Sequence, residues 1–252
     1  MKEVILKTDK LCKTFSNGGV QQHVLKNLDM EIYKGDFTVI MGSSGAGKST
    51  LLYALSGMDK PTLGKIRFNE YEISSYSEDK IAVFRRKNCG FVFQQIYLLD
   101  NMSILDNVLV NGLLVNKNKA EVINKAKQLL SLVKLEESLW NKFPSQLSGG
   151  EAQRAGIVRA LINDPEIIFA DEPTGALNSS YSEAVLNVLS ELNEKGQSIV
   201  MVTHDLKSAR RGNRIVYLRD GIICGECNLG KYISHDKERH DKLDAFLKEM
   251  GW

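Results

Sequence analysis

A glycine-rich run near the amino end of the chain has the composition of a phosphate-binding loop: Gly42-Ser43-Ser44-Gly45-Ala46-Gly47-Lys48-Ser49. Its glycines permit backbone conformations that turn successive N–H groups towards a bound polyphosphate, and a helix that follows adds the positive end of its dipole. Lys48 can then reach the β- and γ-phosphates, and the Ser49 hydroxyl can complete the coordination of Mg²⁺. The run therefore predicts a site for ATP with Mg²⁺.

Two neighbouring carboxylates, Asp171 and Glu172, follow the apolar run 167–170, which is typical of a buried strand. At such a strand end Asp171 can hold magnesium directly or through water. Glu172 can orient or deprotonate the attacking water, a general-base role worth about 10²- to 10⁴-fold in rate. The alternative is a solvated acidic pair, which the phosphate loop makes the weaker interpretation.

Two further polar side chains, Gln94 and His204, also follow apolar runs, at 91–93 and 199–202. Ligands of α/β sheets bind at the carboxyl ends of strands, so His204 can donate a hydrogen bond to the γ-phosphate and Gln94 can contact Mg²⁺ or water. The alternatives are a structural histidine and a polar loop residue.

A second candidate for phosphate binding is Ser148-Gly149-Gly150, which stands between Leu147 and Glu151 and opens the helical run 151–162. One chain therefore offers two phosphate-binding halves. This half belongs to a helical region away from Lys48, so it is useful if it closes over the nucleotide of another copy. The arrangement predicts a dimer, and the alternative is an ordinary loop ahead of a helix.

The elements that must position these residues can be read from the hydrophobic pattern. Apolar residues alternate over 4–41, which predicts half-buried antiparallel strands followed by a buried strand at 37–41 that leads into the glycine loop. A helix over 48–56 then ends at Gly57. From 104 to 163 the pattern is helical throughout.

After Pro165 strands and helices alternate, which indicates a mostly parallel sheet. The expected elements are strands at 167–170 and 198–203, a helix at 178–195, two short strands around Gly221, and an amphipathic helix at 236–250. The predicted fold class is α/β.

Composition and charge indicate which kinds of partner the chain can have. The chain has 252 residues, 43% hydrophobic and 25% charged, and its formal net charge is +2, too small to indicate a nucleic-acid partner. The start of the chain resembles neither a secretory signal nor a transit peptide, and no apolar run approaches the roughly 18 residues needed to cross a bilayer. We expect a cytosolic protein whose membrane role comes through a partner. Cys224 and Cys227 have metal-site spacing, but two matching ligands are lacking, so ordinary thiols are the better interpretation.

The phosphate loop, Gln94, the LSGGE run, Asp171-Glu172 and His204 occur in the order found in ATP-binding subunits of ABC transporters, and the chain resembles that family over essentially its whole length. The resemblance implies a P-loop NTPase core of the ABC ATPase type, with an N-terminal antiparallel β lobe and an inserted α-helical subdomain. It also implies a single domain over 1–252, with the ATP-binding core at 1–95 and 164–228, the helical signature subdomain at 96–163 and an amphipathic tail at 229–252.

The family's motifs also imply roles for individual residues. The catalytic residues would be Glu172, His204, Gln94 and Lys48. The magnesium ligands would be Ser49, Gln94 and Asp171. ATP would be bound by the phosphate loop from Gly42 to Ser49 with Thr50, by Ser148, Gly149, Gly150 and Glu151 of a second copy, and by Phe15, which resembles the aromatic residue that stacks on adenine. The alternative for Phe15 is a residue of the strand core.

The runs around Gln94 and Asp171 are similar to those of the MacB, LolD and FtsE group. Within it, the Asn178-Ser179 pair and the tail 237–252 most resemble ATPases of Gram-positive peptide-antibiotic export and resistance, the bacitracin-type BceA subunits among them. Asn178 departs from the pattern, because the family usually has aspartate there; the loss of charge could change communication between two ATP sites. The resemblance implies a homodimer on the cytoplasmic face of the membrane, with the surface 94–107 receiving a helix of a transmembrane permease. It further implies export of, or resistance to, antimicrobial peptides or handling of lipoprotein-type substrates.

Two other functions remain open. A regulatory, division-type ATPase similar to FtsE would switch the shape of a membrane partner with little turnover. A soluble ABC ATPase acting on nucleic acid or ribosomes would usually carry two cassettes, a long coiled coil or a zinc insertion, and this chain has none of these.

Overall fold

The computed structural model describes residues 2–252 and divides the chain into two compact units. The first comprises the chain up to Ile81 together with Gly196–Trp252, and the second is Ala82–Lys195. Each unit carries part of the predicted chemistry. The boundaries predicted for the helical subdomain, 96–163, remain a prediction.

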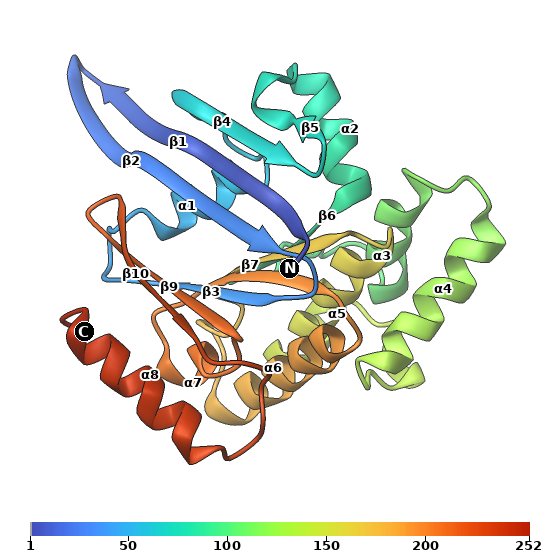
Figure 1. Ribbon diagram of the computed structural model, residues 1–252. Helices are drawn as coiled ribbons and strands as arrows, with labels where there is room; N and C mark the ends of the chain where they lie inside the picture. Colours follow the sequence, from blue (N-terminus) through green and yellow to red (C-terminus); the bar gives the residue numbers. More distant parts are fainter. Residues whose placement is uncertain (1) are drawn as a thin grey trace. The chain divides into compact units, whose positions relative to one another are not determined.

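The first unit contains an antiparallel sheet in the order β2, β1, β4, β5, in which β1 and β2 form the long hairpin of Figure 1. Its strands are β1 (Val4–Asn17), β2 (Val20–Tyr33), β4 (Leu63–Phe68) and β5 (Tyr71–Glu72). Leu28, Met30 and Ile32 are buried, so the alternation along β2 marks its inner face. The predicted β lobe is confirmed, and β4 and β5 add two strands that the sequence pattern had not indicated.

The same unit contains strands in the order β10, β9, β3, β8. They are β3 (Phe37–Met41), β8 (Ser198–Val202), β9 (Arg214–Arg219) and β10 (Ile222–Asn228). β3 pairs in parallel with β8 and β9, while β10 pairs antiparallel with β9. Every residue of β3 and β8 is buried, as expected for strands covered on both faces.

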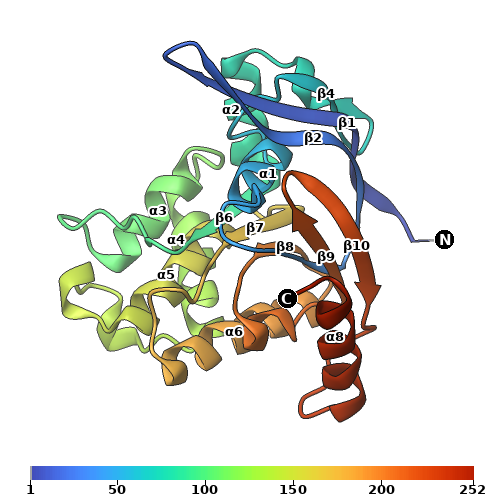
Figure 2. The same ribbon diagram turned by 90° about the vertical axis from the view of Figure 1, so that its left-hand side faces the viewer.

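Three helices complete the first unit: α1 (Lys48–Leu55), α7 (Leu206–Ala209) and α8 (Lys237–Glu249). α8 is the predicted amphipathic tail, with Leu243 and Leu247 buried. It lies alongside β10 (Figure 2), where a Cβ on Gly225 would come within 3.0 Å of the Met250 sulfur. Glycine at this point lets the tail pack closely on the strand.

The second unit contains a parallel strand pair, β6 (Cys89–Phe93) and β7 (Ile167–Asp171), with helices that follow each strand. The helix α2 (Glu78–Asn88) leads into this unit. The others are α3 (Ile104–Leu113), α4 (Lys119–Leu132), α5 (Gly149–Leu161) and α6 (Ser179–Glu194). The predicted α/β class with parallel pairing is confirmed.

The prediction of helix throughout 104–163 is wrong at two breaks, the turn and loop 114–118 between α3 and α4, and the longer stretch between α4 and α5. Lys134 has a φ of +57°, a left-handed conformation that ends α4, and only two short 3-10 turns follow, at Glu137–Leu139 and Pro144–Gln146. In this non-helical stretch Trp140 is buried, and its indole N–H donates to the Leu135 carbonyl at 3.0 Å.

Candidate functional site

The glycine-rich run forms a tight loop between β3 and α1 in the first unit. Gly42 has a φ of +152°, and a Cβ there would lie 2.0 Å from the Leu218 carbonyl oxygen, so no side chain fits. Gly47, the residue before α1, has a φ of +99°. Strand, glycine loop and helix therefore follow one another as a phosphate loop requires.

Lys48 lies across this loop. Its Nζ donates to the carbonyl oxygens of Gly42 and Ser43, each at 2.8 Å, and only 7% of the residue is exposed. Ser49 and Thr50 are half-buried in the first turn of α1, while Ser43, Ser44 and Gly45 are exposed and Ala46 is buried. The ammonium is thus held at the start of a helix, beside loop residues that solvent can reach.

His204 emerges near the same loop. β8 lies beside β3 with Ile40 opposite Val202, and the Thr203 N–H donates to the Ile40 carbonyl at 3.3 Å. His204 is exposed. The next residue, Asp205, caps α7. Burial alone would raise the pKa of Asp205, but hydrogen bonds from the Ser208 hydroxyl and N–H hold it below its usual value.

Gln94 and the carboxylate pair are brought together in the second unit. β6 and β7 run in parallel with Phe93 opposite Asp171, so all three polar residues leave neighbouring strand ends. A Cβ on Gly175 would lie 2.8 Å from the Gln94 Nε2 and 3.3 Å from a Glu172 carboxylate oxygen. The amide and the carboxylate therefore converge on the backbone of Gly175.

Glu172 has a φ of +44°, in the left-handed region that non-glycine residues avoid. Such strain, of order 1–3 kcal/mol, persists where the surrounding structure fixes the backbone, and it concentrates at functional sites. Asp171 and Glu172 are both half-buried.

Ser148 caps α5, so this helix begins at Gly149 rather than at the predicted Glu151. The Glu151 N–H donates to the Ser148 hydroxyl at 3.4 Å, and the Glu151 carboxylate accepts from the Ser148 N–H and hydroxyl, both at 2.7 Å. These hydrogen bonds, that of the hydroxyl foremost, hold the pKa of Glu151 below its usual value. The capping box fixes the second helix start without bulky side chains at Gly149 and Gly150.

The loop after Glu172 packs on this helix start. Cβ atoms added at Gly149 and Gly150 would meet the Leu177 side chain at 3.1 Å and the Tyr181 side chain at 2.9 Å. Asn178 caps α6, because its side-chain oxygen accepts from the Tyr181 N–H at 3.1 Å. The departure from aspartate therefore keeps a competent helix cap.

Phe15 lies on β1 with 44% of its surface exposed, and the Lys13 Nζ stands 4.9 Å from the centre of its ring. The alternative that Phe15 belongs to the strand core is therefore wrong. An exposed ring beside a cation leaves one face able to stack.

Two buried or half-buried polar side chains, Gln153 and Arg159, were missed by the sequence interpretation, while Asn107 was named only as the end of the predicted permease surface. All three hydrogen-bond to backbone carbonyls around Gln94: Gln153 to Phe93 just before it, Arg159 to Ile96 and Asn107 to Leu99 after it. The signal for Gln153 and Arg159 was available, because both are polar residues in the mostly apolar run of α5.

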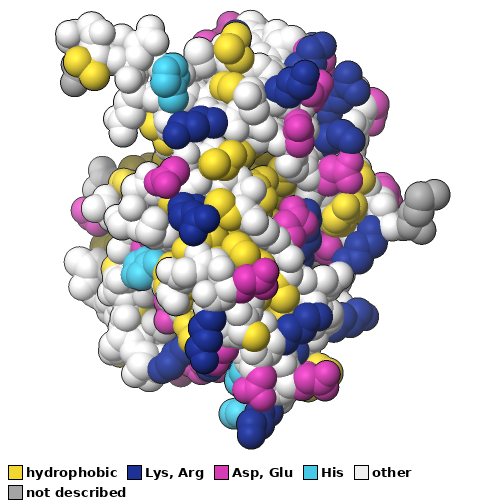
Figure 3. Space-filling model, turned by 60° about the vertical axis from the view of Figure 1, so that its left-hand side comes forward, with side chains coloured by type: hydrophobic (Ala, Val, Ile, Leu, Met, Phe, Trp, Pro, Cys, Tyr) yellow, Lys and Arg dark blue, Asp and Glu magenta, His cyan; other side chains and the backbone are white. Residues whose placement is uncertain are grey.

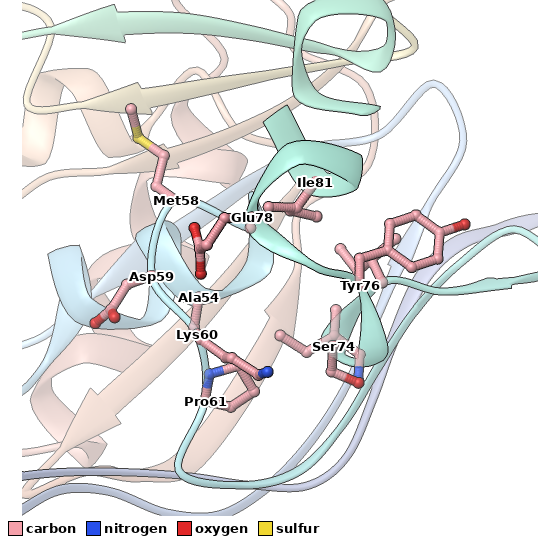
Figure 4. A pocket seen from close by; sticks show the side chains of 12 residues that line it. Ala54, Met58, Asp59, Lys60, Pro61, Ser74, Tyr76, Glu78 and Ile81 are labelled. Carbon is pink, nitrogen blue, oxygen red and sulfur yellow. The ribbon is translucent and has the colours of Figure 1, made fainter. Parts of the chain in front are cut away.

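A separate pocket of about 170 Å³ lies at the carboxyl end of α1, the end away from the phosphate loop. Figure 4 shows Ala54 and Ile81 together with the charged side chains of Asp59, Lys60 and Glu78 around it. None of the residues predicted to bind ATP or Mg²⁺ lines this pocket.

Each unit offers oxygen donors of the kind that Mg²⁺ prefers: the Ser49 hydroxyl in the first unit, and the Gln94 amide and Asp171 carboxylate at neighbouring strand ends in the second. Among residues 2–252 no group of three or more His, Cys, Asp or Glu side chains could hold a metal, and the four cysteines are free thiols. Cys224 and Cys227 both lie on one strand, β10.

Comparison with known proteins gives a consistent result. A family profile described as ABC transporter matches residues 25–175. The uncharacterized ABC transporter ATP-binding protein MJ1508 of Methanocaldococcus jannaschii is 44% identical over 219 residues, which cover 87% of this chain and 97% of that protein. The lipoprotein-releasing system ATP-binding protein LolD of Idiomarina loihiensis is 40% identical over 224 residues, 88% of this chain and 98% of that protein.

The macrolide export ATP-binding/permease protein MacB of Campylobacter fetus is 38% identical over 246 residues; the match covers 98% of this chain and 38% of that longer protein. Among solved structures, the dimeric post-hydrolysis state of the ATP-binding cassette MJ0796 bound to ADP and Pi superposes with a TM-score of 0.82 at 39% identity, covering 88% of this chain and 98% of that one.

Proposed function

Because this chain belongs to the ABC transporter family as an ATP-binding, ATP-hydrolysing subunit, we propose that it works as a homodimer that drives a membrane permease. The convergence of Gln94 and Glu172 on Gly175 at neighbouring strand ends carries the catalytic part of this proposal. That arrangement puts a metal-ligating amide next to a general base, which a purely structural acidic pair would not require.

In the proposed site the loop from Gly42 to Ser49, with Thr50, binds the phosphates of ATP, and Lys48 neutralises charge on the β- and γ-phosphates. Phe15 stacks on the adenine. Ser49, Gln94 and Asp171 hold Mg²⁺, which when bound neutralises the charge that develops on the phosphates.

Hydrolysis needs a base and a group that recognises the γ-phosphate. Glu172 accepts a proton from the attacking water, and His204 donates a hydrogen bond to the γ-phosphate. Lys48 and the loop N–H groups stabilise the charge that moves onto the leaving phosphate.

The dimer follows from the second helix start. Ser148 and Glu151 form the capping box of α5, and Gly149 and Gly150 form its first turn at the positive end of the helix dipole. We propose that this start binds the γ-phosphate of the ATP held by the other copy. The MJ0796 cassette, which was solved as a dimer bound to ADP and Pi, supports this arrangement.

The permease surface is proposed to be 94–107. Tyr97 and Leu99 are 63% and 48% exposed on this segment, a pair of apolar side chains suited to receive an amphipathic helix. Within residues 2–252 no helix has the length and apolar character needed to cross a bilayer. We therefore propose that the protein is peripheral, on the cytoplasmic face of the membrane.

Lipoprotein release and macrolide export are the activities named for the LolD and MacB relatives. We propose a substrate of related kind, an antimicrobial peptide or a lipoprotein, handled by the permease as in the BceA-type systems. The subdomain boundaries given above, with the signature motif inside 96–163, belong to the same proposal.

A nucleic-acid partner is disfavoured by charge. On the face shown in Figure 3, Lys and Arg side chains are interspersed with Asp and Glu, and the net charge is +2. A division-type regulatory role was encouraged only by Asn178, and this residue keeps its capping function. Neither alternative gains a specific observation.

The test is ATP turnover by the purified chain with the Glu172→Gln variant beside it. We expect Glu172→Gln to bind ATP with Mg²⁺ as tightly as the parent while hydrolysis falls by about 10²- to 10⁴-fold. Glu70→Gln, at an exposed position in the first unit, is the matched control and should keep full turnover. Unchanged hydrolysis in Glu172→Gln would overturn the catalytic assignment. Separately, the permease proposal fails if no membrane protein co-purifies with the chain from its native membrane.

A further inference from the structure

We propose that Arg159 is a positioning residue that fastens the segment after Gln94 to α5, so that a push on the permease surface is carried to Ser148. The inference rests on the proposed function, because it assigns the mechanical connection between the permease surface and the shared ATP site. All the residues involved belong to the second unit.

The guanidinium of Arg159 grips two successive carbonyl groups. Its Nη1 donates to the Tyr97 oxygen at 2.5 Å and its Nη2 donates to the Ile96 oxygen at 2.6 Å. Burial lowers the pKa of Arg159, although a guanidinium keeps its charge under all physiological conditions. Hydrogen bonds from a partly desolvated cation are stronger than ordinary backbone ones.

A second side chain of α5 grips the same segment on the other side of Gln94. Gln153 is 1% exposed, and its Nε2 donates to the Phe93 carbonyl at 2.9 Å. Between these grips the helix has a glycine, Gly156, where a Cβ would come within 3.1 Å of the Ile96 side chain. The segment therefore lies against α5 and is pinned before and after Gln94.

The far part of the segment is held by α3. The Asn107 side chain accepts from the Leu99 N–H at 2.7 Å and donates to the carbonyls of Leu99, Met102 and Ser103 at 3.0–3.2 Å. With its backbone groups satisfied from behind, the segment leaves Tyr97 and Leu99 facing solvent. It is a preorganised platform rather than a loose loop.

The direction of transmission follows from the length of the helix. α5 is 13 residues long, Ser148 caps its start, and Arg159 stands near its end. An α-helix is stiff over such a length, so a displacement of Ile96 and Tyr97 moves Arg159 and, through the helix, Ser148. Without the hydrogen bonds of Arg159 to Ile96 and Tyr97, the segment after Gln94 could move while α5 stayed in place.

Arginine is the residue type that suits this position. The planar fork of arginine reaches two carbonyls at once, whereas lysine is a point donor that can hold one of them firmly. Arg159→Lys therefore keeps the charge and the stem but loosens the grip, and Arg159→Met removes it. Lys127→Met, on an exposed face of α4 in the same unit, is the control for loss of one positive charge.

The test is hydrogen–deuterium exchange of the full chain in the Glu172→Gln background, with and without ATP and Mg²⁺. Without nucleotide, amides of 95–103 should exchange about 10- to 100-fold faster in Arg159→Met than in the parent, the ratio expected for losing hydrogen bonds to a charged group. On addition of ATP, the parent and Lys127→Met should gain protection in 95–103 and at the start of α5 together. Arg159→Lys and Arg159→Met should gain it at α5 but much less in 95–103.

ATP turnover, measured in the chain that keeps Glu172, supplies a second readout. We expect Arg159→Lys to lower kcat by about tenfold with the KM for ATP unchanged, because Gln94 loses its position while the phosphate loop is intact. A folded Arg159 variant with parental exchange and parental ATP response in 95–103 would overturn the inference. If the parent itself gains no protection with ATP, the proposed dimer fails instead, and the nucleotide-free exchange of 95–103 still decides the role of Arg159.

Discussion

At the scale of single residues, Gly175 has no room for a side chain beside Gln94, because a Cβ there would lie 2.8 Å from the Gln94 Nε2. The Gln94 amide and the Glu172 carboxylate lie so near this glycine that a methyl group would displace one of them. Both are ends of flexible side chains, so the displacement costs little stability. Small changes of position are expensive for catalysis, since a misplacement of about 1 Å can cost about 10²-fold in rate.

Gly175→Ala should therefore lower kcat by about 10- to 100-fold while the free energy of unfolding changes by less than about 1 kcal/mol. Steady-state ATP turnover and urea unfolding measure the two quantities. Gly230→Ala is the control: its φ of +70° makes alanine cost about 1–2 kcal/mol, but nothing lies within 4 Å of the added Cβ. The explanation is contradicted if Gly230→Ala, and not Gly175→Ala, loses turnover.

At the scale of elements, two helix starts control the geometry of the second unit. Asn178 caps α6 immediately after the catalytic strand's loop, and asparagine is as good a cap as aspartate. The sequence difference that suggested altered communication is thus neutral for the helix itself.

Asn178→Ala should destabilise the protein by about 0.5–2 kcal/mol, whereas Asn178→Asp should leave stability unchanged or raise it slightly through the helix dipole. Thermal and urea unfolding provide the measurement. Ser179→Ala, at the next and exposed position, should change stability by less than about 0.5 kcal/mol. Equal losses in both alanine variants would show that capping by Asn178 contributes nothing.

The capping box at α5 makes the second helix start sensitive to acid. The pKa of Glu151 is lowered in the folded protein by the Ser148 hydroxyl and N–H. A lowered folded pKa means that the carboxylate stabilises the fold above its ordinary pKa of 4.5, and that this stability is lost as pH falls through the folded value.

Glu151→Gln should accordingly show a smaller loss of unfolding free energy than the parent on acidification from about pH 6 to below pH 4.5. Urea unfolding at a series of pH values tests this expectation. Glu249→Gln, at the end of α8, is the control for loss of one carboxylate, and its unfolding free energy should change with pH as that of the parent does. Parallel pH curves for Glu151→Gln and the parent would remove Glu151 from the acid response.

Elements that are determined by local sequence patterns could be predicted, whereas those that depend on contacts between distant residues could not. The strand before Gly42 and the helix after it could be predicted, because a buried apolar run and a glycine-rich turn are local signals. The break after α4 could not, since it rests on a left-handed Lys134 and on where Trp140 is buried. Nor could the grip of Arg159, whose partners are backbone carbonyls 62 and 63 residues away.

At the scale of the whole molecule, the candidate chemistry is distributed over two compact units. The phosphate loop, Lys48 and His204 belong to the first unit, while Gln94, Glu172 and the Ser148 helix start belong to the second. Symmetric pairing of two identical chains produces two equivalent sites from one kind of interface. In the proposed dimer each ATP is bound by the phosphate loop of one copy and the Ser148 helix start of its mate.

Complementation between two inactive variants tests this sharing most directly. Lys48→Ala disables the phosphate loop, and Ser148→Arg blocks the opposite helix start, so each homodimer should hydrolyse no ATP. When equal amounts are mixed, half of the dimers are mixed pairs with one intact site, and turnover should recover to roughly a quarter of the parental rate. Turnover that stays absent in the mixture, although mixed dimers form, would contradict a site shared between two copies.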